Sequence, residues 1–345
     1  MEEMLRDKIF TIKIPLFFVL AFLFAGASFL PQTANSQSQD DNRISTRIVP
    51  EAPVPFQKVT MTLVSFSVDL DRSTISWSLG GKLALSGVGE KEFSFLAGGV
   101  GEAKRVDITI KTIFSETITK SYIIAPGEIT LLWETIDSYT PPFYKGKAMP
   151  SSEANIKVVA VPKMKSGGVD VKPENLIYEW KRNNKVVSEN SGYGRNTFVF
   201  KAGYPLSNEK IDVFVETIDG RSVAKSQLNI KIGEPVVYFY ENRPLEGVYY
   251  ERAIPERVVL DTGEIAIVAE PYFFSALGKM KRDLLFSWLL NEKEIPGSDI
   301  DRGAVILRAP SGTEGIAELI SVVSHKTKIL QEKDYRILIQ FGNPQ

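Results

Sequence analysis

The sequence predicts an all-β protein built of three tandem β-sandwich domains. The first observation is a tryptophan that recurs in one local frame: Trp77, Trp180 and Trp288 lie 103 and 108 residues apart. Each is preceded by an apolar and a polar residue, and each is followed by Gly or Asn three positions on and by Lys five positions on. A period near 105 residues is too long for a solenoid repeat and fits one sandwich per repeat.

The second observation is the pattern of alternating strands that follows each tryptophan. About twenty residues later come the pairs Phe93 and Phe95, Phe198 and Phe200, and Val305 and Leu307. Further alternating strands are predicted at residues 106–111, 211–216 and 316–322. Alternation of apolar and polar side chains is typical of strands with one face in a core, so each repeat reads as a complete sandwich.

Glycine turns recur with the strands. A Ser-Gly-x-Gly turn precedes the Phe-x-Phe strand in the first two repeats, with Gly87 and Gly89 in one and Gly192 and Gly194 in the other. Strands rather than a helix follow these turns, so they are predicted to be structural turns and not nucleotide-binding loops. Residues 276–285 carry a glycine and lead directly into a strand, so we expect a loop or a single turn there.

Composition narrows the function. The 345 residues are 43% hydrophobic, and 41 Lys plus Arg stand against 42 Asp plus Glu. This balance predicts no nucleic-acid partner, because no bulk positive charge is present to bind phosphates. The chain has no cysteine, which excludes disulfides, thiolate zinc sites, a cysteine nucleophile and a lipid-modified cysteine. No cofactor is predicted.

The N-terminal segment is predicted to direct export. Lys8 and Lys13 precede residues 14–30, a run of 17 residues without a charge. A basic flank, an apolar run and then small residues is the order of a secretory signal, and small-x-small cleavage sites stand at residues 25–27 and 34–36. The run is also barely long enough to span a bilayer, so both a cleaved signal peptide and an uncleaved signal-anchor remain open.

The repeats and a recurring junction give the predicted domain boundaries. Residues 1–36 are the signal or anchor helix and residues 37–47 a flexible polar linker. The three sandwiches are then residues 48–126, 127–233 and 234–345. The second and third begin at Gly127 and Glu234, within the matching stretches Pro-Gly-Glu and Ile-Gly-Glu. So few residues separate the repeats that we expect stiff connections between them.

Two aromatic-rich stretches follow these junctions, and the first repeat shows no counterpart. They cover residues 129–148 and 235–253. We expect these inserts to lie at the domain junctions and to stiffen them, with Trp133 or Phe239 touching the neighbouring domain. The alternative is a ligand platform, because aromatic rings also bind sugars and peptides. The candidate platform residues are Tyr139, Phe143, Tyr144, Tyr238, Tyr240, Tyr249 and Tyr250.

A tryptophan on the third strand, then a short hairpin and alternating strands, resembles the immunoglobulin-like (Ig-like) sandwich. More narrowly, it resembles the cysteine-free bacterial Ig-like and PKD-like domains of exported surface proteins. The resemblance covers roughly residues 48–343 and supports a fold better than a function. Where PKD domains carry an Asp-Gly-rich turn after the tryptophan, this chain has Leu-Gly-Gly-Lys at residues 79–82 and Arg-Asn-Asn-Lys at 182–185. The subfamily therefore stays open.

Reactive or metal-binding residues are sparse. The single histidine, His325, has polar neighbours between two strands, so we expect an exposed hairpin residue rather than a general base. Oxygen-only calcium sites are conceivable at Asp69 and Asp71, at Asp299 and Asp301, and at residues 40–41. None has the ligand number of a calcium loop, so we expect solvated turns. No acid pair is set apart by an apolar environment, which disfavours a glycosidase.

The sequence thus predicts a non-enzymatic exported protein, either tethered to the membrane through its N-terminal segment or secreted. Its expected role is that of a cell-surface spacer or adhesion-type interaction module with a protein or glycan partner. The alternative is a carbohydrate- or peptide-binding module that uses the aromatic inserts, and an enzyme comes third.

Overall fold

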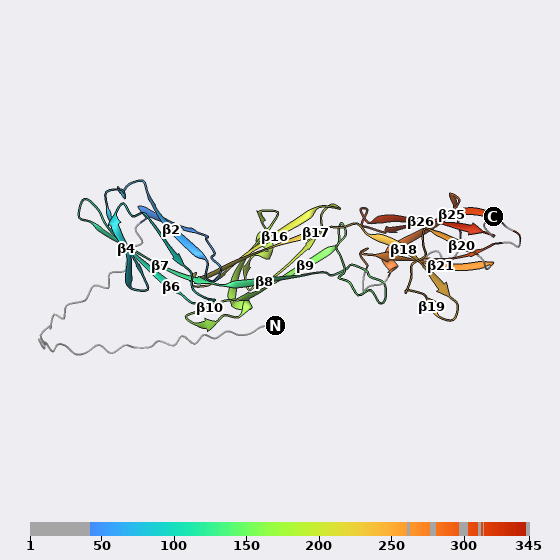
Figure 1. Ribbon diagram of the computed structural model, residues 1–345, viewed down its shortest axis with the longest axis horizontal. Coiled ribbons are helices and arrows are strands. Elements are labelled where there is room, and N and C mark those ends of the chain that lie inside the picture. Colours follow the sequence, from blue (N-terminus) through green and yellow to red (C-terminus); the bar gives the residue numbers. More distant parts are fainter. Residues whose placement is uncertain are drawn as a thin grey trace, which may run out of the picture. The chain divides into compact units, whose positions relative to one another are not determined.

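The computed structural model describes residues 42–260, 263–276, 281–296, 303–309, 312 and 314–342. Over these ranges the chain consists of β-strands joined by turns and short 3-10 helices, and it contains no α-helix. The predicted signal or anchor helix at residues 1–36 lies outside the described residues. Figure 1 shows the strands in chain order, coloured from blue to red.

The first sandwich is formed by two sheets. One has the order β1-β2-β5 and the other β4-β3-β6-β7. The strands are β1 (Ile44–Val49), β2 (Lys58–Ser65), β3 (Thr74–Leu79), β4 (Lys82–Val88), β5 (Glu92–Leu96), β6 (Lys104–Lys111) and β7 (Thr117–Pro126). Buried residues of both sheets form one hydrophobic core around Trp77.

The second sandwich repeats this arrangement. Its sheets have the orders β15-β9-β8 and β13-β12-β16-β17. The main strands are β8 (Glu128–Thr135), β9 (Asn155–Lys163), β12 (Leu176–Arg182), β13 (Lys185–Val186), β15 (Thr197–Lys201), β16 (Asn208–Thr217) and β17 (Ser222–Lys231). Two small additions are the hairpin of β10 (Lys165–Ser166) and β11 (Val169–Asp170), and β14 (Gly192–Tyr193), which pairs with β12.

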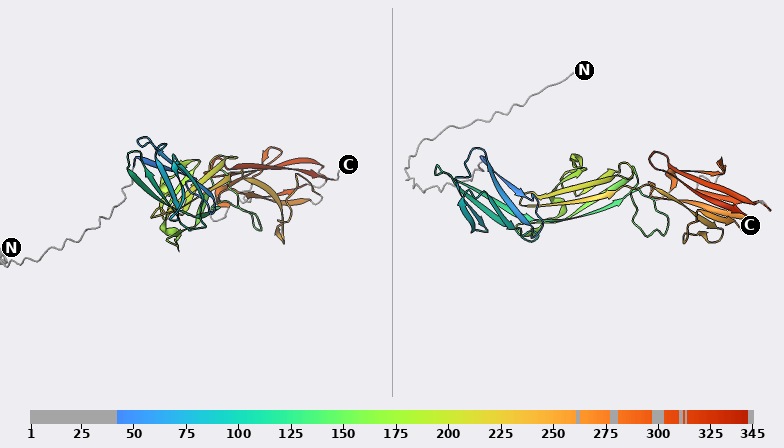
Figure 2. Two further views of the ribbon diagram at one scale, coloured as in Figure 1. Left: turned by 60° about the vertical axis from the view of Figure 1, so that its left-hand side comes forward. Right: turned by 45° about the horizontal axis from the view of Figure 1, so that its top comes forward.

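The third sandwich has the sheet orders β19-β18-β21-β24 and β20-β26-β25-β22-β23. Its strands are β18 (Val236–Arg243), β19 (Gly247–Val248), β20 (Arg257–Leu260), β21 (Glu264–Tyr272), β22 (Leu284–Leu290), β23 (Lys293–Glu294), β24 (Ala304–Arg308), β25 (Gly315–His325) and β26 (Glu332–Phe341). The right-hand view of Figure 2 shows the three groups of strands, coloured blue to teal, green to yellow and orange to red. The shared strand order makes all three groups Ig-like sandwiches.

The recurring tryptophan is the centre of each core. Trp77, Trp180 and Trp288 are each 0% exposed. The indole N–H of Trp77 donates to the carbonyl of Glu90 at 2.8 Å, and that of Trp180 donates to the carbonyl of Arg195 at 2.8 Å. Such a partner stabilises a buried indole, because an unpaired N–H in a core is destabilising. Among the described residues the indole N–H of Trp288 has no such partner.

The Ser-Gly-x-Gly turn supplies that carbonyl. Gly89 and Gly194 directly precede the residues that supply the carbonyls, Glu90 and Arg195. These glycines have φ of +74° and +70°, a backbone conformation that residues other than glycine rarely adopt. A Cβ on either glycine would lie 3.1 Å from a backbone oxygen, that of Asp71 or that of Glu174. The turn is therefore structural, as predicted. In the third repeat the corresponding turn, with Asp299 and Asp301, lies outside the described residues.

Two predictions about the repeats are wrong. Residues 44–47, expected in a flexible linker, belong to strand β1, in which Ile44 is 1% exposed. The stretches beginning at Ile129 and Val236 are not inserts, since they are strands β8 and β18, which correspond to β1. The first repeat seemed to lack this strand because Ser45, Thr46 and Arg47 give it little apolar content.

What the second and third repeats add is a longer connection after the first strand. Residues 136–154 and 244–263 replace the short connection 50–57 of the first repeat. The expected contacts of Trp133 and Phe239 across the junctions are also wrong. Trp133 packs on the core of its own sandwich under Lys147, and Phe239 packs on Trp288 and Tyr335 of its own sandwich.

The first two sandwiches share a sheet. Strand β7 ends at Pro126 and pairs in parallel with β17, with Ala125 opposite Ser222 and Pro126 opposite Val223. Gly127, which alone separates β7 from β8, donates its N–H to the carbonyl of Val223 at 3.1 Å. The two four-stranded layers thereby become one hydrogen-bonded sheet across the junction.

Truncation of a central tryptophan should unfold its sandwich. We expect Trp180→Ala to lower the free energy of unfolding by about 3–5 kcal/mol, because it leaves a large cavity and an unpaired carbonyl. Chemical denaturation followed by circular dichroism measures the change. Tyr204→Ala, at a side chain that is 76% exposed in the same sandwich, is the control and should have little effect. An equal effect of both substitutions would contradict the assigned core.

Candidate functional site

The seven candidate platform residues separate into buried and exposed groups. Tyr139 and Tyr240 are 6% and 7% exposed and therefore belong to the protein interior. Phe143 is 85% exposed, and Tyr144 and Tyr238 are also exposed, whereas Tyr249 and Tyr250 are half-buried. The residues with accessible rings remain candidates for ligand contact.

The structure brings six of the seven residues, all except Tyr249, into one aromatic cluster. Tyr272 and Phe273 are further members of this cluster. The loop 136–154 of the second sandwich contributes Tyr139, Phe143 and Tyr144, and the other members belong to the third sandwich. Ring centroids lie 6.2 Å apart for Phe143 and Tyr250 and 5.8 Å apart for Tyr144 and Tyr272. The hydroxyl groups of Tyr240 and Tyr272 are hydrogen-bonded at 2.6 Å.

The cluster continues into the core of the third sandwich. Tyr238 contacts Tyr272 edge to face at 5.7 Å and Tyr335 at 5.6 Å. Tyr335 in turn packs on Phe239, which packs on Trp288 at 5.0 Å. Aromatic pairs at such distances add to the stability that burial alone provides. The outer rings of the cluster are therefore anchored to the core around Trp288.

Glu270 of β21 is the polar centre of the cluster. Its side chain is 2% exposed and accepts hydrogen bonds from the hydroxyl of Tyr139 at 3.2 Å and from that of Tyr250 at 3.0 Å. Lys281 donates to the same carboxylate at 2.7 Å. Burial, and next the charge of Glu270, raise the pKa of both tyrosines well above the usual range, so both hydroxyls stay protonated as donors.

An open groove of about 500 Å³ lies beside the cluster. Its lining consists of Phe143, Glu246, Val248, Tyr249, Tyr250 and Glu251. The ring of Tyr249 carries the guanidinium of Arg243 at 3.8 Å, and its hydroxyl donates to Glu251 at 2.8 Å. Aromatic rings beside carboxylates can receive a sugar or a peptide segment, and the volume is in the range of ligand sites.

The loop 136–154 also joins the second sandwich to the third by backbone hydrogen bonds. Tyr139 donates its N–H to the carbonyl of Phe274 at 2.7 Å, and its own carbonyl accepts from Phe273 at 2.8 Å. The N–H of Ala276 donates to the carbonyl of Asp137 at 2.7 Å. The loop therefore adds to the edge of the third sandwich in the manner of a short strand.

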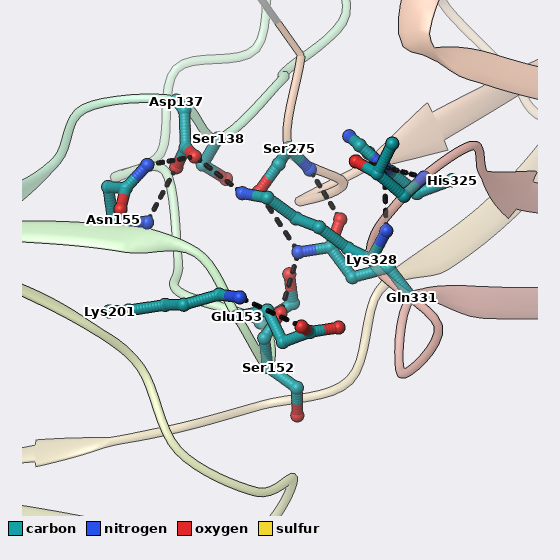
Figure 3. Close-up of polar contacts among 12 residues, drawn as sticks. Asp137, Ser138, Ser152, Glu153, Asn155, Lys201, Ser275, His325, Lys328 and Gln331 are labelled. Atoms are coloured by element: carbon teal, nitrogen blue, oxygen red, sulfur yellow. Dashed lines mark hydrogen bonds and ion pairs between the residues drawn. The ribbon is translucent and has the colours of Figure 1, made fainter.

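Polar side chains complete this second junction (Figure 3). Lys328, in the turn between β25 and β26, donates to Asp137 at 2.7 Å, and the two side chains are only 15% and 19% exposed. Gln331 is fully buried and donates to the carbonyl of Ser152 at 2.6 Å, while it exchanges hydrogen bonds with Ser275. These contacts hold one end of the third sandwich against the loop.

His325 stands at the base of the same turn and is half-buried rather than exposed, which corrects the prediction. Its Nδ1 accepts the backbone N–H groups of Thr327 and Lys328, each at 3.1 Å. Burial, and next the charge of Lys328, lower the pKa of His325. The imidazole therefore stays neutral at pH 7 and shapes the turn that carries Lys328.

The described candidates for calcium binding, Asp69 and Asp71, contact only groups of the protein in exposed turns. The carboxylate of Asp69 accepts from the backbone of Arg72, and Asp71 pairs with Lys91 at 2.8 Å, as expected for solvated turns. Within the described ranges, no three His, Cys, Asp or Glu residues converge as a metal site would require. Residues 40–41 and the pair Asp299 and Asp301 lie outside these ranges.

Several residues of the site were not predicted from the sequence. Tyr272 and Phe273 lie in the aromatic run 272–274, which could have been grouped with Tyr238 once β18 and β21 were paired. Glu270, Lys281 and Gln331 gave no signal, because their roles depend on contacts between distant segments. Among the described residues, no helix has the length and hydropathy required to cross a membrane.

Comparison with known proteins yields distant structural likenesses. No protein-family model matches the chain, and no curated protein is significantly similar to it. The three N-terminal domains of the bacteriophage RB49 Highly Immunogenic Outer Capsid protein (Hoc) align over 88% of this chain and 98% of that one, at 10% identity and a TM-score of 0.27. The central Fibronectin-III array of RIM-binding protein aligns over 89% of this chain and all of that one, at 11% identity and a TM-score of 0.28.

The fibronectin(III)-like modules of Clostridium thermocellum CbhA align over 55% of this chain and 94% of that one, at 11% identity and a TM-score of 0.27. Likenesses this weak support no statement about what the chain binds. The assignment of Ig-like sandwiches rests on the strand order within this chain.

The pair of Glu270 and Lys281 offers a test of the cluster. We expect Lys281→Met to lower the free energy of unfolding of the third sandwich by about 3 kcal/mol, because it leaves a buried carboxylate without its cation. The double variant Glu270→Gln with Lys281→Met should recover most of this loss, since it buries no charge, the glutamine oxygen still accepts from one tyrosine hydroxyl, and its amide N–H can donate to the oxygen of the other. Denaturation of both variants, with Lys293→Met as an exposed control, measures the difference. Equal losses in the single and double variants would contradict the buried pair.

Proposed function

We propose that the chain is an exported, non-enzymatic surface protein that acts as a spacer and interaction module. The observation that carries this proposal is the backbone pairing across both junctions. Strand β7 pairs with β17 at the first junction, and the loop 136–154 pairs with residues 273–276 at the second. Domains joined only by flexible linkers need no such bonds, so the arrangement favours a role in holding an interaction face at a set distance.

The chemistry of the buried polar groups supports a role without catalysis. Glu270 is engaged by three donors and is closed to solvent, and His325 has its Nδ1 occupied by two backbone N–H groups. A general acid or base must reach a substrate, and these groups cannot do so without dismantling the contacts that hold the second junction and the cluster.

Export is proposed from the sequence of the N-terminal segment. A basic flank and an apolar run at residues 14–30 suit either a cleaved signal or an anchor. Attachment to the cell surface follows if the run is retained, and secretion follows if it is removed. The proposal includes the narrower resemblance of the three sandwiches to bacterial PKD-like domains of exported proteins.

The second candidate function is a ligand-binding module for a carbohydrate or a peptide. The groove favours it, because Phe143 is 85% exposed and lines the groove together with Tyr249 and Tyr250. In the free protein this ring packs only on Tyr250, at 6.2 Å between ring centroids, and leaves most of its surface in solvent. Binding of a partner would supply the missing contacts.

Fixed spacing can be measured at the second junction. The chain has no cysteine, so spin labels at Lys185→Cys and Lys293→Cys report a single interdomain distance. We expect a narrow distance distribution in the otherwise unchanged chain and a broader one after Lys328→Met with Gln331→Ala. The pair of substitutions removes contacts worth about 2 kcal/mol or more, since Asp137 then keeps a largely buried charge without its cation.

Lys157→Met is the matched control, because it removes an ion pair of 3.6 Å that lies within the second sandwich. A broad distribution before any junction substitution would contradict the spacer function. The groove would then be the better guide to function.

Export should depend on the apolar run alone. We expect Leu20→Arg to retain the chain in the cytoplasm, because an arginine in the centre of such a segment costs about 2.5–3.5 kcal/mol on insertion. Fractionation and protease accessibility measure the location, and Leu20→Val is the control. Normal export of the arginine variant would contradict the signal assignment, and mass spectrometry of the mature N-terminus distinguishes cleavage from anchoring.

A further inference from the structure

An apolar tip lies at one end of the first sandwich. It consists of Phe66, Ile113 and Phe114, which are 102%, 45% and 86% exposed. Phe66 follows strand β2 directly, and the other two lie in the hairpin between β6 and β7. Three apolar side chains that face solvent at loop ends contribute nothing to a core, so a contact outside the sandwich is their most direct use.

The two loops of the tip belong to the same end of the sandwich. Ser65 stands opposite Ile44, and Thr74 at the far side of the first loop stands opposite Lys111, where the hairpin begins. The loop and the hairpin are each closed by a hydroxyl group. The Oγ of Ser65 accepts the N–H groups of Ser67 and Val68.

The hydroxyl of Thr112 closes the hairpin. It accepts the N–H groups of Phe114 and Glu116 at 3.3 and 3.2 Å. Ser115 completes the turn with a φ of +62° and donates its N–H to the carbonyl of Thr112. Both loops therefore present their phenylalanines from a fixed backbone.

The polypeptide enters the first sandwich at this same tip. Arg43, one residue before β1, pairs through its guanidinium with Glu116 of the hairpin, and its carbonyl accepts from the hydroxyl of Ser65 at 2.7 Å. The residue that leads back to the N-terminal segment thus touches both loops that carry the phenylalanines. Only residues 31–42 separate the apolar run from this point, and they span at most about 43 Å.

We propose that the apolar tip docks on the surface of the lipid bilayer that holds the N-terminal apolar run. This inference rests on the proposed export and on retention of the run as an anchor. A short tether keeps the tip at a high effective concentration near the membrane, where aromatic side chains favour the interface between headgroups and acyl chains. Docking would orient the first sandwich relative to the membrane.

The charges at the tip indicate that neutral lipid is sufficient. Arg43 is paired with Glu116, and Lys91 is paired with Asp71 at 2.8 Å. Arg72 of the first loop and Lys111 at the start of the hairpin are exposed cations, and the acidic Asp69 and Glu90 of the same end balance them in number. The tip therefore has no net basic charge for anionic headgroups. Docking should therefore depend on the phenylalanines and be insensitive to salt and to the anionic lipid content.

The experiment uses the full chain, inserted through its apolar run into phosphatidylcholine vesicles. A single cysteine at Ser67→Cys carries an environment-sensitive fluorophore, and nitroxide-bearing lipids report its contact with the bilayer. The side chain of Ser67 is exposed, and only its backbone takes part in the turn. A label at Glu51→Cys, in the connection after β1 at the opposite end of the sandwich, gives the reference signal for a position away from the membrane.

We expect strong quenching at position 67 and weak quenching at position 51. Phe66→Ser and Phe114→Ser together should lower the quenching at position 67 to the reference level, and each alone should weaken the docking equilibrium about tenfold. Phe56→Ser is the matched control, because Phe56 is 71% exposed in the connection opposite the tip. This control should leave the quenching unchanged.

Weak quenching at position 67 in the chain with both phenylalanines would overturn the proposal. Strong quenching that survives both Phe→Ser changes, or that is lost when anionic lipid is omitted or salt is raised, would overturn it as well. Insertion into vesicles does not require export in the cell. Failure of the proposed export would therefore appear in the fractionation of Leu20→Arg and not in this measurement.

Discussion

A single residue between two strands constrains the arrangement of the first two sandwiches. Strand β7 ends at Pro126 and β8 begins at Glu128, so the chain passes from one core to the next through Gly127 alone. A Cβ at this position would lie 2.8 Å from the Cγ of Met164 and 3.1 Å from the Cβ of Ala224. Because only a glycine fits between these side chains, β7 can approach β17 closely enough to pair with it.

At the second junction, backbone hydrogen bonds also join two neighbouring sandwiches, but a different part of the chain provides them. Residues 232–235 connect β17 to β18, and Gly233 donates its N–H to the carbonyl of Pro150 at 2.9 Å. The loop 136–154, which the first sandwich lacks, covers the end of the third sandwich and satisfies backbone groups there. Peptide groups at such an end would otherwise face water without regular partners, so the loop both joins and caps.

The positions of the central strands were largely predictable from the sequence, because a buried tryptophan and alternating strands recur in the same pattern in each repeat. The first strand was missed in the first repeat, where only Ile44 and Ile48 carry the apolar pattern. A strand at the edge of a sheet needs few inward residues, and its ladder bonds come from the backbone, which the sequence pattern does not record. The same limit explains why Trp133 was misplaced, as its contacts follow from the pairing of β8 with β9.

For the candidate site, the sequence identified the aromatic residues but not their arrangement. Tyr139 and Tyr250 were both singled out, yet the carboxylate that joins them, Glu270, lies 131 residues from one and 20 from the other. Composition cannot reveal such a meeting point. It depends on the pairing of the loop 136–154 with the third sandwich, which in turn depends on Lys328 and Gln331 in a distant hairpin.

Two phenylalanines near the second junction share a strained backbone conformation but differ in what offsets its cost. Phe143 and Phe273 have nearly the same left-handed φ, +66° and +65°. For Phe273 the cost is offset within the protein, because its N–H donates to Tyr139 and its carbonyl accepts from Ser151 across the junction. Phe143 makes a ring contact with Tyr250 but leaves most of its surface in solvent. Stability alone would favour a glycine or asparagine at that position. Phe56 and Leu206 are also exposed and have a φ of +61°, so strain by itself does not mark a binding residue. What distinguishes Phe143 is its place in the lining of the groove, beside Tyr249 and Tyr250.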